Sequence, residues 1–192
     1  MTSYVIDLKP LVNHISDSDL ENLCASNPEL KFETNADGNL IVMSPTGTLT
    51  GAKNGDLFAQ IWTWNRQYKL GRVFDSSTGF KLSNNSVRSP DVSWMKLSKW
   101  NSLTDKQKRG FAPIDPDFVL ELMSPTDDLL VIQQKMKEYM TCDIKLGWLI
   151  NPDEKQVEIY RQGKDKEVLD NPSTLSGEDV MPNLIVDLSD IF

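Results

Sequence analysis

The chain has 192 residues, of which 39% are hydrophobic and 25% charged, a composition typical of soluble globular proteins and sufficient for one domain spanning residues 1–192. It contains no apolar run near the roughly eighteen residues of a membrane span, and its N-terminus lacks the basic start and apolar stretch of a secretory signal. The net charge of −8 repels polyanions at long range, which argues against a protein that coats DNA regardless of its sequence.

The first half of the chain alternates between helical and extended patterns. Ser16 or Asp17 can cap a first helix, which Asn27-Pro28 ends. Asp37-Gly38 lies between two alternating segments, a strong signal for a hairpin turn. The expected elements are, in order, a helix before Asn27, strands 30–34 and 40–43, a helix at about 49–68 with apolar residues at intervals of three and four, and strands 71–74, 80–82 and 91–94.

The second half predicts a central strand, a helix and a hairpin. Residues 117–123 alternate between two faces, one with Phe118, Leu120 and Leu122 and the other with Asp117, Val119, Glu121 and Met123. A helix capped by Thr126 or Asp127 is expected at about 128–141, a hairpin at 146–150 and 156–160, and a further strand at 167–169. This order predicts an α/β fold in which helices flank a mixed central sheet.

One segment is locally basic. Between Lys96 and Arg109 the chain carries five cations, with Trp94 and Trp100 interleaved. Cations and aromatic rings together can form a nucleic-acid surface, but the same composition is typical of a solvated helical face. Both interpretations stay open from the sequence.

The helix expected at 128–141 contains the strongest chemical signal. Its apolar stripe runs through Ile132, Met136, Tyr139 and Met140, and Lys135 falls inside that stripe, whereas Lys137 lies roughly 200° around the helix and points to solvent. An ammonium on a packed face needs a partner. The nearest candidate is Glu121, a carboxylate that is itself out of place in an apolar strand unless it is paired or metal-bound. The alternative is a lysine whose stem packs while its ammonium reaches water.

Two further carboxylates are candidates for the same site. Asp91 follows Pro90 at the start of an expected strand, and Glu33 lies in the first strand of the hairpin, where a surface position is the alternative. Two carboxylates on neighbouring strands can hold a hard divalent cation, and a nearby lysine can orient water for attack on phosphorus. His14 is the sole histidine, which excludes a multi-histidine zinc site, and its place near the N-terminus without helpful neighbours argues against a Ser-His-Asp triad. The arrangement predicts a metal-dependent nuclease.

Several motifs together resemble a known family. They are Phe32-Glu33, residues 37–45, the run Pro116-Asp117-Phe118-Val119-Leu120-Glu121-Leu122-Met123-Ser124-Pro125, then Lys135 and Tyr139, Gly147-Trp148-Leu149-Ile150-Asn151-Pro152, and residues 181–184 and 188–192. The pattern is similar to that of the Uma-two family, a branch of the PD-(D/E)XK nuclease superfamily described as restriction endonucleases. It covers nearly the whole chain and implies a restriction-endonuclease-like fold.

The resemblance also implies roles for individual residues. Asp91, Glu121 and the backbone carbonyl of Leu122 are expected to hold Mg²⁺ or Mn²⁺, with Glu33 assisting directly or through water. Lys135 is expected to orient the attacking water, and DNA is the expected substrate. Two departures bear on activity: Met123 stands where the superfamily has its lysine, and Thr50-Gly51-Ala52-Lys53 contains no histidine where the family often has one.

Other functions and the assembly remain to be distinguished. A catalytically silent nuclease-fold protein that binds nucleic acid or protein is the second hypothesis, and a structural dimer is the third. The apolar segments 184–186 and 191–192 look exposed, which favours a homodimer over a monomer that buries its own C-terminus. Cys24 and Cys142 lack CxxC or metal-ligand spacing, so we expect free thiols in a reducing cytoplasm.

Overall fold

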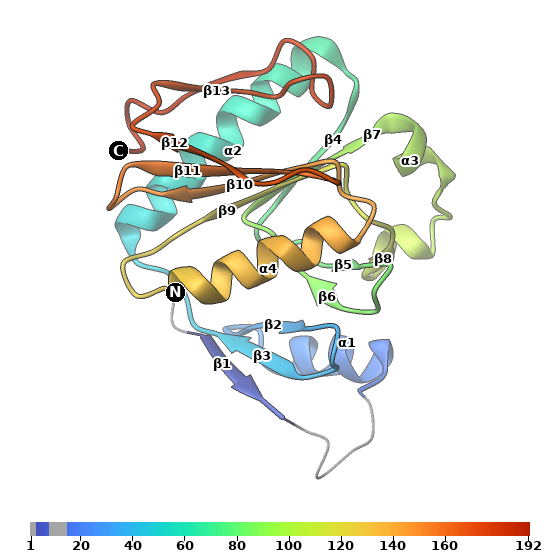
Figure 1. Cartoon of the computed structure of the whole chain (residues 1–192). Coiled ribbons are helices and arrows are strands. Elements are labelled where there is room, and N and C mark those ends of the chain that lie inside the picture. Colours follow the sequence, from blue (N-terminus) through green and yellow to red (C-terminus); the bar gives the residue numbers. More distant parts are fainter. Residues whose placement is uncertain (1–2, 8–14) are drawn as a thin grey trace.

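A mixed β-sheet forms the middle layer of the molecule. The computed structural model describes residues 3–7 and 15–192, so His14 lies outside the described residues. In these ranges six strands form the sheet in the order β12-β11-β10-β9-β7-β4 (Figure 1). β9 and β10 are parallel, and the other neighbours are antiparallel. The bounds are β4 Gly71–Asp75, β7 Val92–Lys96, β9 Phe118–Leu122, β10 Leu146–Asn151, β11 Gln156–Arg161 and β12 Glu167–Asp170.

Each face of this sheet packs on a different helix, as Figure 1 shows. Phe118 and Leu120 of β9 join a core with α2 (Thr48–Tyr68), whereas Val119 joins a second core with Met136 and Tyr139 of α4 (Leu129–Thr141). The alternation expected along 117–123 is therefore confirmed, and it directs Glu121 toward α4. The predicted α/β fold with a mixed central sheet flanked by helices is also confirmed.

A second sheet lies on the far side of α4. Among the described residues its strand order is β1-β3-β2-β6-β5-β8, and α1 (Asp17–Ser26) packs on it through Leu20 (Figure 1). The β2–β3 hairpin turns at Gly38, whose φ of 81° suits glycine. The strands are β1 Ser3–Ile6, β2 Lys31–Thr34, β3 Leu40–Met43, β5 Phe80–Lys81, β6 Val87–Arg88 and β8 Ala112–Pro113. Helix α4 is thus enclosed between two sheets.

The cap expected for α4 was wrong by one residue. Asp128 is the N-cap, and its carboxylate accepts a hydrogen bond from the backbone N–H of Leu130. Asp127 instead accepts from the backbone N–H of Ser124 at 2.8 Å, which closes the preceding loop. The cap at Ser16 is confirmed, because its hydroxyl accepts from the backbone N–H of Asp19.

The basic segment contributes less aromatic surface than the sequence suggested. It forms α3 (Leu97–Ser102) and a 3-10 turn, Gln107–Arg109. Trp94 is buried in the core and its indole N–H donates to Asn65 at 2.9 Å, so its interpretation as a nucleic-acid contact was wrong. Lys99 forms ion pairs with Asp117 and Asp143.

The C-terminal segment is buried rather than exposed. Leu184, Val186, Leu188 and Ile191 all join the core of α2, next to β13 (Thr174–Ser176) and β14 (Ile185–Asp187). The expectation that this end presents an apolar patch was wrong. The central sheet covers one side of α2, and the apolar side chains of the C-terminal segment pack into the same core. Ile185 alone among these side chains, within the described residues, is largely exposed, at 60%. Across the same ranges, no helix combines the length and hydropathy needed to cross a bilayer.

This packing predicts unequal effects of truncating neighbouring C-terminal side chains. Leu188→Ala should lower the free energy of unfolding by about 2 to 5 kcal/mol, because it leaves a cavity against α2. Ile185→Ala, on the exposed face of β14, should change it by less than about 0.5 kcal/mol. Urea denaturation measures both, and equal effects would contradict the buried C-terminus.

Candidate active site

A cleft of about 700 Å³ opens between α4, the β2–β3 hairpin and the beginning of α2. Glu33, Asp91, Glu121, Leu122 and Lys135 all line it. The structure therefore brings together every residue that the sequence singled out for this site, although they span 102 positions between Glu33 and Lys135.

Strand pairing places Asp91 and Glu121 side by side. β7 and β9 are antiparallel, with Val92 opposite Leu120. Continuing this register by one residue puts Asp91 opposite Glu121, and directly opposite residues project from the same face of a sheet. Asp91 Oδ2 also accepts a hydrogen bond from the backbone N–H of Leu122 at 2.8 Å, which fixes this carboxylate at the end of β9.

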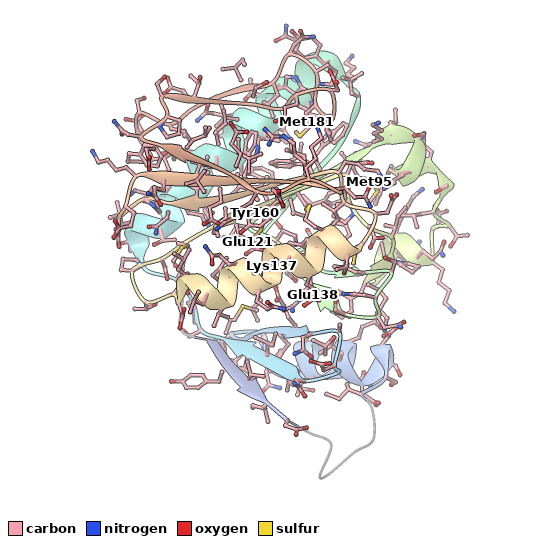
Figure 2. The ribbon with its side chains drawn as sticks, in the orientation of Figure 1. Met95, Glu121, Lys137, Glu138, Tyr160 and Met181 are labelled. Atoms are coloured by element: carbon pink, nitrogen blue, oxygen red, sulfur yellow. The ribbon has the colours of Figure 1, made fainter. Side chains whose placement is uncertain are left out.

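Lys135 joins two carboxylates across the cleft. Its Nζ lies 2.8 Å from Glu121 Oε1 and 3.1 Å from Glu33 Oε1, whereas Lys137 is exposed and, although it also lines the cleft, is not a partner of either carboxylate within the described residues. The helical phasing that separated these two lysines is confirmed. Figure 2 shows Glu121 between the central sheet and α4, with Lys137 and Glu138 on that helix.

Tyr139 lies one turn beyond Lys135 and completes the hydrogen bonding of Glu121 Oε1. Its hydroxyl donates to that oxygen at 2.8 Å. The apolar stripe placed Tyr139 on the packed face, but it gave no sign that the hydroxyl reaches a carboxylate. The sequence did contain one indication of this contact, namely a tyrosine in the same helical stripe as a charged residue.

Glu33 is buried and held by protein donors at both oxygens. Oε1 accepts from the backbone N–H of Ser89 at 2.9 Å in addition to Lys135, and Oε2 accepts from Arg88 Nη1 at 3.0 Å. A surface position for Glu33 was therefore the wrong alternative, since its side chain is only 1% exposed. The other side of Arg88 forms an ion pair with Glu138 of α4. Sequence reasoning missed Arg88, because an arginine in a short polar segment is ordinary at a surface.

The pKa values of the two buried glutamates shift in opposite directions. Burial raises the pKa of Glu121 to about 7; Lys135 opposes that rise, and Asp91 and Glu33 add to it. Burial alone would also raise the pKa of Glu33, but Lys135 and Arg88 outweigh it and lower the pKa to about 2. Burial would lower the pKa of Lys135, yet Glu121 and Glu33 raise it above its usual value. Lys135 therefore keeps its proton at neutral pH.

The donor set fits a cation that retains water. Among residues 3–7 and 15–192, no cluster of three or more His, Cys, Asp or Glu side chains is arranged around a common metal position. Within the same ranges, Glu121 Oε2 and Asp91 Oδ1 accept no hydrogen bond, since the contacts above use Oε1 and Oδ2. Mg²⁺ is commonly bound through one or two carboxylates, with water and substrate phosphate as further ligands. Two carboxylates with one open oxygen each suit that mode.

The two departures noted in the sequence have different structural outcomes. Met123 is buried in the core beside α4, so no cation stands at that position. Thr50 lines the cleft from the first turn of α2. None of the cations between Lys96 and Arg109 lines the cleft, so the basic segment contributes no positive side chain to the cleft.

The chain is similar to known proteins both in sequence and in fold. The sequence model of the Uma2 family, described as "Putative restriction endonuclease", matches residues 17–189. The chain belongs to the Uma2 family.

One solved structure with a similar fold comes from Anabaena variabilis and is described as a "putative nuclease belonging to DUF820". It is 21% identical to this chain, with a TM-score of 0.70, and the match covers 84% of this chain and 89% of that one. The restriction-endonuclease-like fold class is thereby confirmed. No curated protein matches the chain.

The bonding of Glu33 predicts a specific loss of stability in acid. Its folded-state pKa of about 2 lies below the ordinary 4.5, so its charge stabilises the fold above the ordinary value, and this contribution is lost as the pH falls toward 2. Glu33→Gln cannot show this loss. The difference in unfolding free energy between wild type and Glu33→Gln should therefore shrink by on the order of 2 kcal/mol between about pH 6 and about pH 3.

Urea denaturation across that pH range measures the difference. Glu29→Gln, at an exposed position, serves as the control and should run parallel to wild type. A constant difference between wild type and Glu33→Gln at every pH would contradict the bonding described for Glu33.

Proposed function

We propose that this chain is a metal-dependent endonuclease that hydrolyses phosphodiester bonds in DNA and works as one domain. The observation that carries the proposal is the Lys135 ammonium, fixed between Glu33 and Glu121 in the cleft that Asp91 also lines. Membership of a family described as restriction endonucleases supports it. Asp91, Glu121 and the backbone carbonyl of Leu122 would hold Mg²⁺ or Mn²⁺.

A divalent cation bound there would supply Lewis-acid activation of the phosphate group. The protein's own side chains would hold the substrate phosphate and orient the attacking water. An ammonium has three N–H donors, and the two carboxylates engage two of them. The third can orient a water or a phosphate oxygen, and the positive charge offsets charge that develops on the phosphate. Because Lys135 stays protonated, it does not take the proton of the attacking water.

Glu33 and Tyr139 would act through other residues. Both oxygens of Glu33 already accept protein hydrogen bonds, so it serves to fix Lys135 rather than to bind the metal. Tyr139 donates to Glu121 Oε1 and leaves Oε2 for the metal. Glu33, Asp91, Glu121 and Lys135 remain the proposed catalytic group, with Glu33 in a positioning role.

The second candidate is a catalytically silent nuclease-fold protein that binds nucleic acid or another protein. The burial of Met123 where the superfamily has its lysine favours it, and so does the lack of a three-ligand metal cluster among the described residues. Incubation of plasmid DNA with Mg²⁺, and in parallel with EDTA, separates the two. Cleavage with Mg²⁺ alone supports the nuclease, and intact plasmid in both supports the silent protein.

Assembly and location belong to the same proposal. A homodimer would let each subunit address one strand of a duplex. The C-terminal residues do not support it. β1 and the first turn of α4 expose Tyr4, Val5, Leu130 and Val131, but the last three also line the cleft. With a DNA substrate we place the protein in the cytoplasm, where the free thiols of Cys24 and Cys142 would stay reduced.

The metal ligands can be tested without activity. Asp91→Asn and Glu121→Gln keep side-chain shape but remove charge, and each should abolish Mn²⁺ binding in calorimetry because two carboxylates supply the protein's charge at the site. Asp153→Asn, an exposed carboxylate between β10 and β11, should bind as wild type does. Undiminished binding in either cleft variant would refute the ligand assignment.

The two lysines of α4 provide a matched pair for catalysis. Lys135→Met should reduce the rate of plasmid cleavage by about a hundred-fold or more, because it removes a fixed positive charge beside the phosphate. Mn²⁺ binding should persist in this variant. Lys137→Met removes a cation that also lines the cleft but is exposed and is not paired with Glu33 or Glu121 within the described residues, so this variant should cleave normally. Equal rates for the two variants would remove Lys135 from the mechanism.

A further inference from the structure

One side of the first two turns of α2 lines the cleft, and the N-terminus of this helix lies beside it. The N-cap residue is Gly47, and no side chain within residues 3–7 and 15–192 caps the first turn of the helix. The N–H groups at a helix N-terminus and the dipole of a 21-residue helix both favour an anion there. A helix terminus alone does not make a site, so the side chains around it decide.

Three polar side chains follow one another at intervals of four residues along this side of the helix. Thr46, Thr50 and Asn54 all line the cleft. In the described part of the chain, Thr46 Oγ1 and Asn54 Oδ1 are buried without any hydrogen-bond partner, two of four such side-chain atoms there. Thr50 is only 8% exposed, and within the described ranges its hydroxyl makes no hydrogen bond. Buried polar groups in native proteins are nearly always paired, so two buried unpaired atoms, with the unpaired Thr50 hydroxyl between them along the helix, indicate a ligand.

We propose that this terminus, with Thr46, Thr50 and Asn54, binds a backbone phosphate of the nucleic acid next to the one that is cut. The inference rests on the proposed nuclease function and names a substrate contact of the same cleft. The threonine hydroxyls donate to phosphate oxygens, and the Asn54 amide donates once its nitrogen faces the ligand, an orientation that exchanges two atoms of similar appearance.

The charge of the cleft explains why neutral donors serve here. Glu33, Asp91 and Glu121 line the same cleft, and the whole chain carries a net charge of −8. Lysines line the cleft too, but the buried ammonium of Lys135 is already engaged by two of these carboxylates. Hydroxyl, amide and helix N–H donors attract a phosphate without being neutralised in this way. An acidic protein can thus hold a polyanion locally.

The test measures binding to a short fluorescent DNA duplex by anisotropy in EDTA, where no cleavage is expected. Thr46→Val and Thr50→Val keep the side-chain shape and remove one donor each, so each should weaken binding about five-fold. Thr63→Val, on the exposed side of α2, is the control and should bind as wild type does. Unchanged affinity in both cleft variants overturns the proposal.

Two further measurements distinguish phosphate binding at the subsite from a structural role of the Thr50 hydroxyl, and neither depends on catalysis. Because the Thr50 hydroxyl has no partner in the described protein, Thr50→Val should leave the urea midpoint unchanged or raise it; a lowered midpoint would mean the hydroxyl is structural. Titration with inorganic phosphate should shift the amide NMR signals of residues 48–50 in wild type and less in Thr50→Val. No shift in wild type, together with no DNA binding, refutes the subsite.

The outcomes also distinguish this subsite from the proposed nuclease. Wild type that binds DNA through Thr50 but never cleaves it with Mg²⁺ or Mn²⁺ keeps the subsite and refutes the nuclease. Cleavage with Mg²⁺ at equal affinity in wild type and Thr50→Val keeps the nuclease and refutes the subsite.

Discussion

The ion pairs of Lys135 are the constraint on which the site depends. A buried ammonium is costly unless it is paired and hydrogen-bonded, and here Glu121 from the central sheet and Glu33 from the second sheet supply the partners. The same contacts join both sheets to α4. Arg88 extends the network, since it binds Glu33 on one side and Glu138 of α4 on the other. Lys135 therefore connects three layers of the fold at the wall of the cleft.

The network also gives Glu33, Asp91 and Glu121 different hydrogen bonding and hence different roles. Glu33 is enclosed by donors at both oxygens, whereas Glu121 and Asp91 each use one oxygen for protein contacts within the described residues. The first arrangement fixes a charge, and the second leaves room for a ligand. This difference is why we assign the metal to Asp91 and Glu121 and a positioning role to Glu33.

Local patterns predicted those parts of the site that depend on periodicity. Alternation along 117–123 assigned Glu121 to the face of α4, and helical spacing distinguished Lys135 from Lys137. The role of Arg88 required long-range pairing: its partner Glu33 lies 55 residues away, and the two meet through the antiparallel pairing of β2 with β6. The burial of Leu188 and Ile191 depends equally on how the chain returns to cover α2. Such packing has no signature within a short window of sequence.

The central claim is that Asp91 and Glu121 bind one divalent cation beside Lys135. Crystals soaked in Mn²⁺ and measured at the manganese absorption edge test it most directly. The account predicts one anomalous peak between the open oxygens of Asp91 and Glu121, at roughly 2 Å from each, as for carboxylate ligands of small divalent cations. A difference map without such a peak, or a peak elsewhere in the cleft, would contradict it.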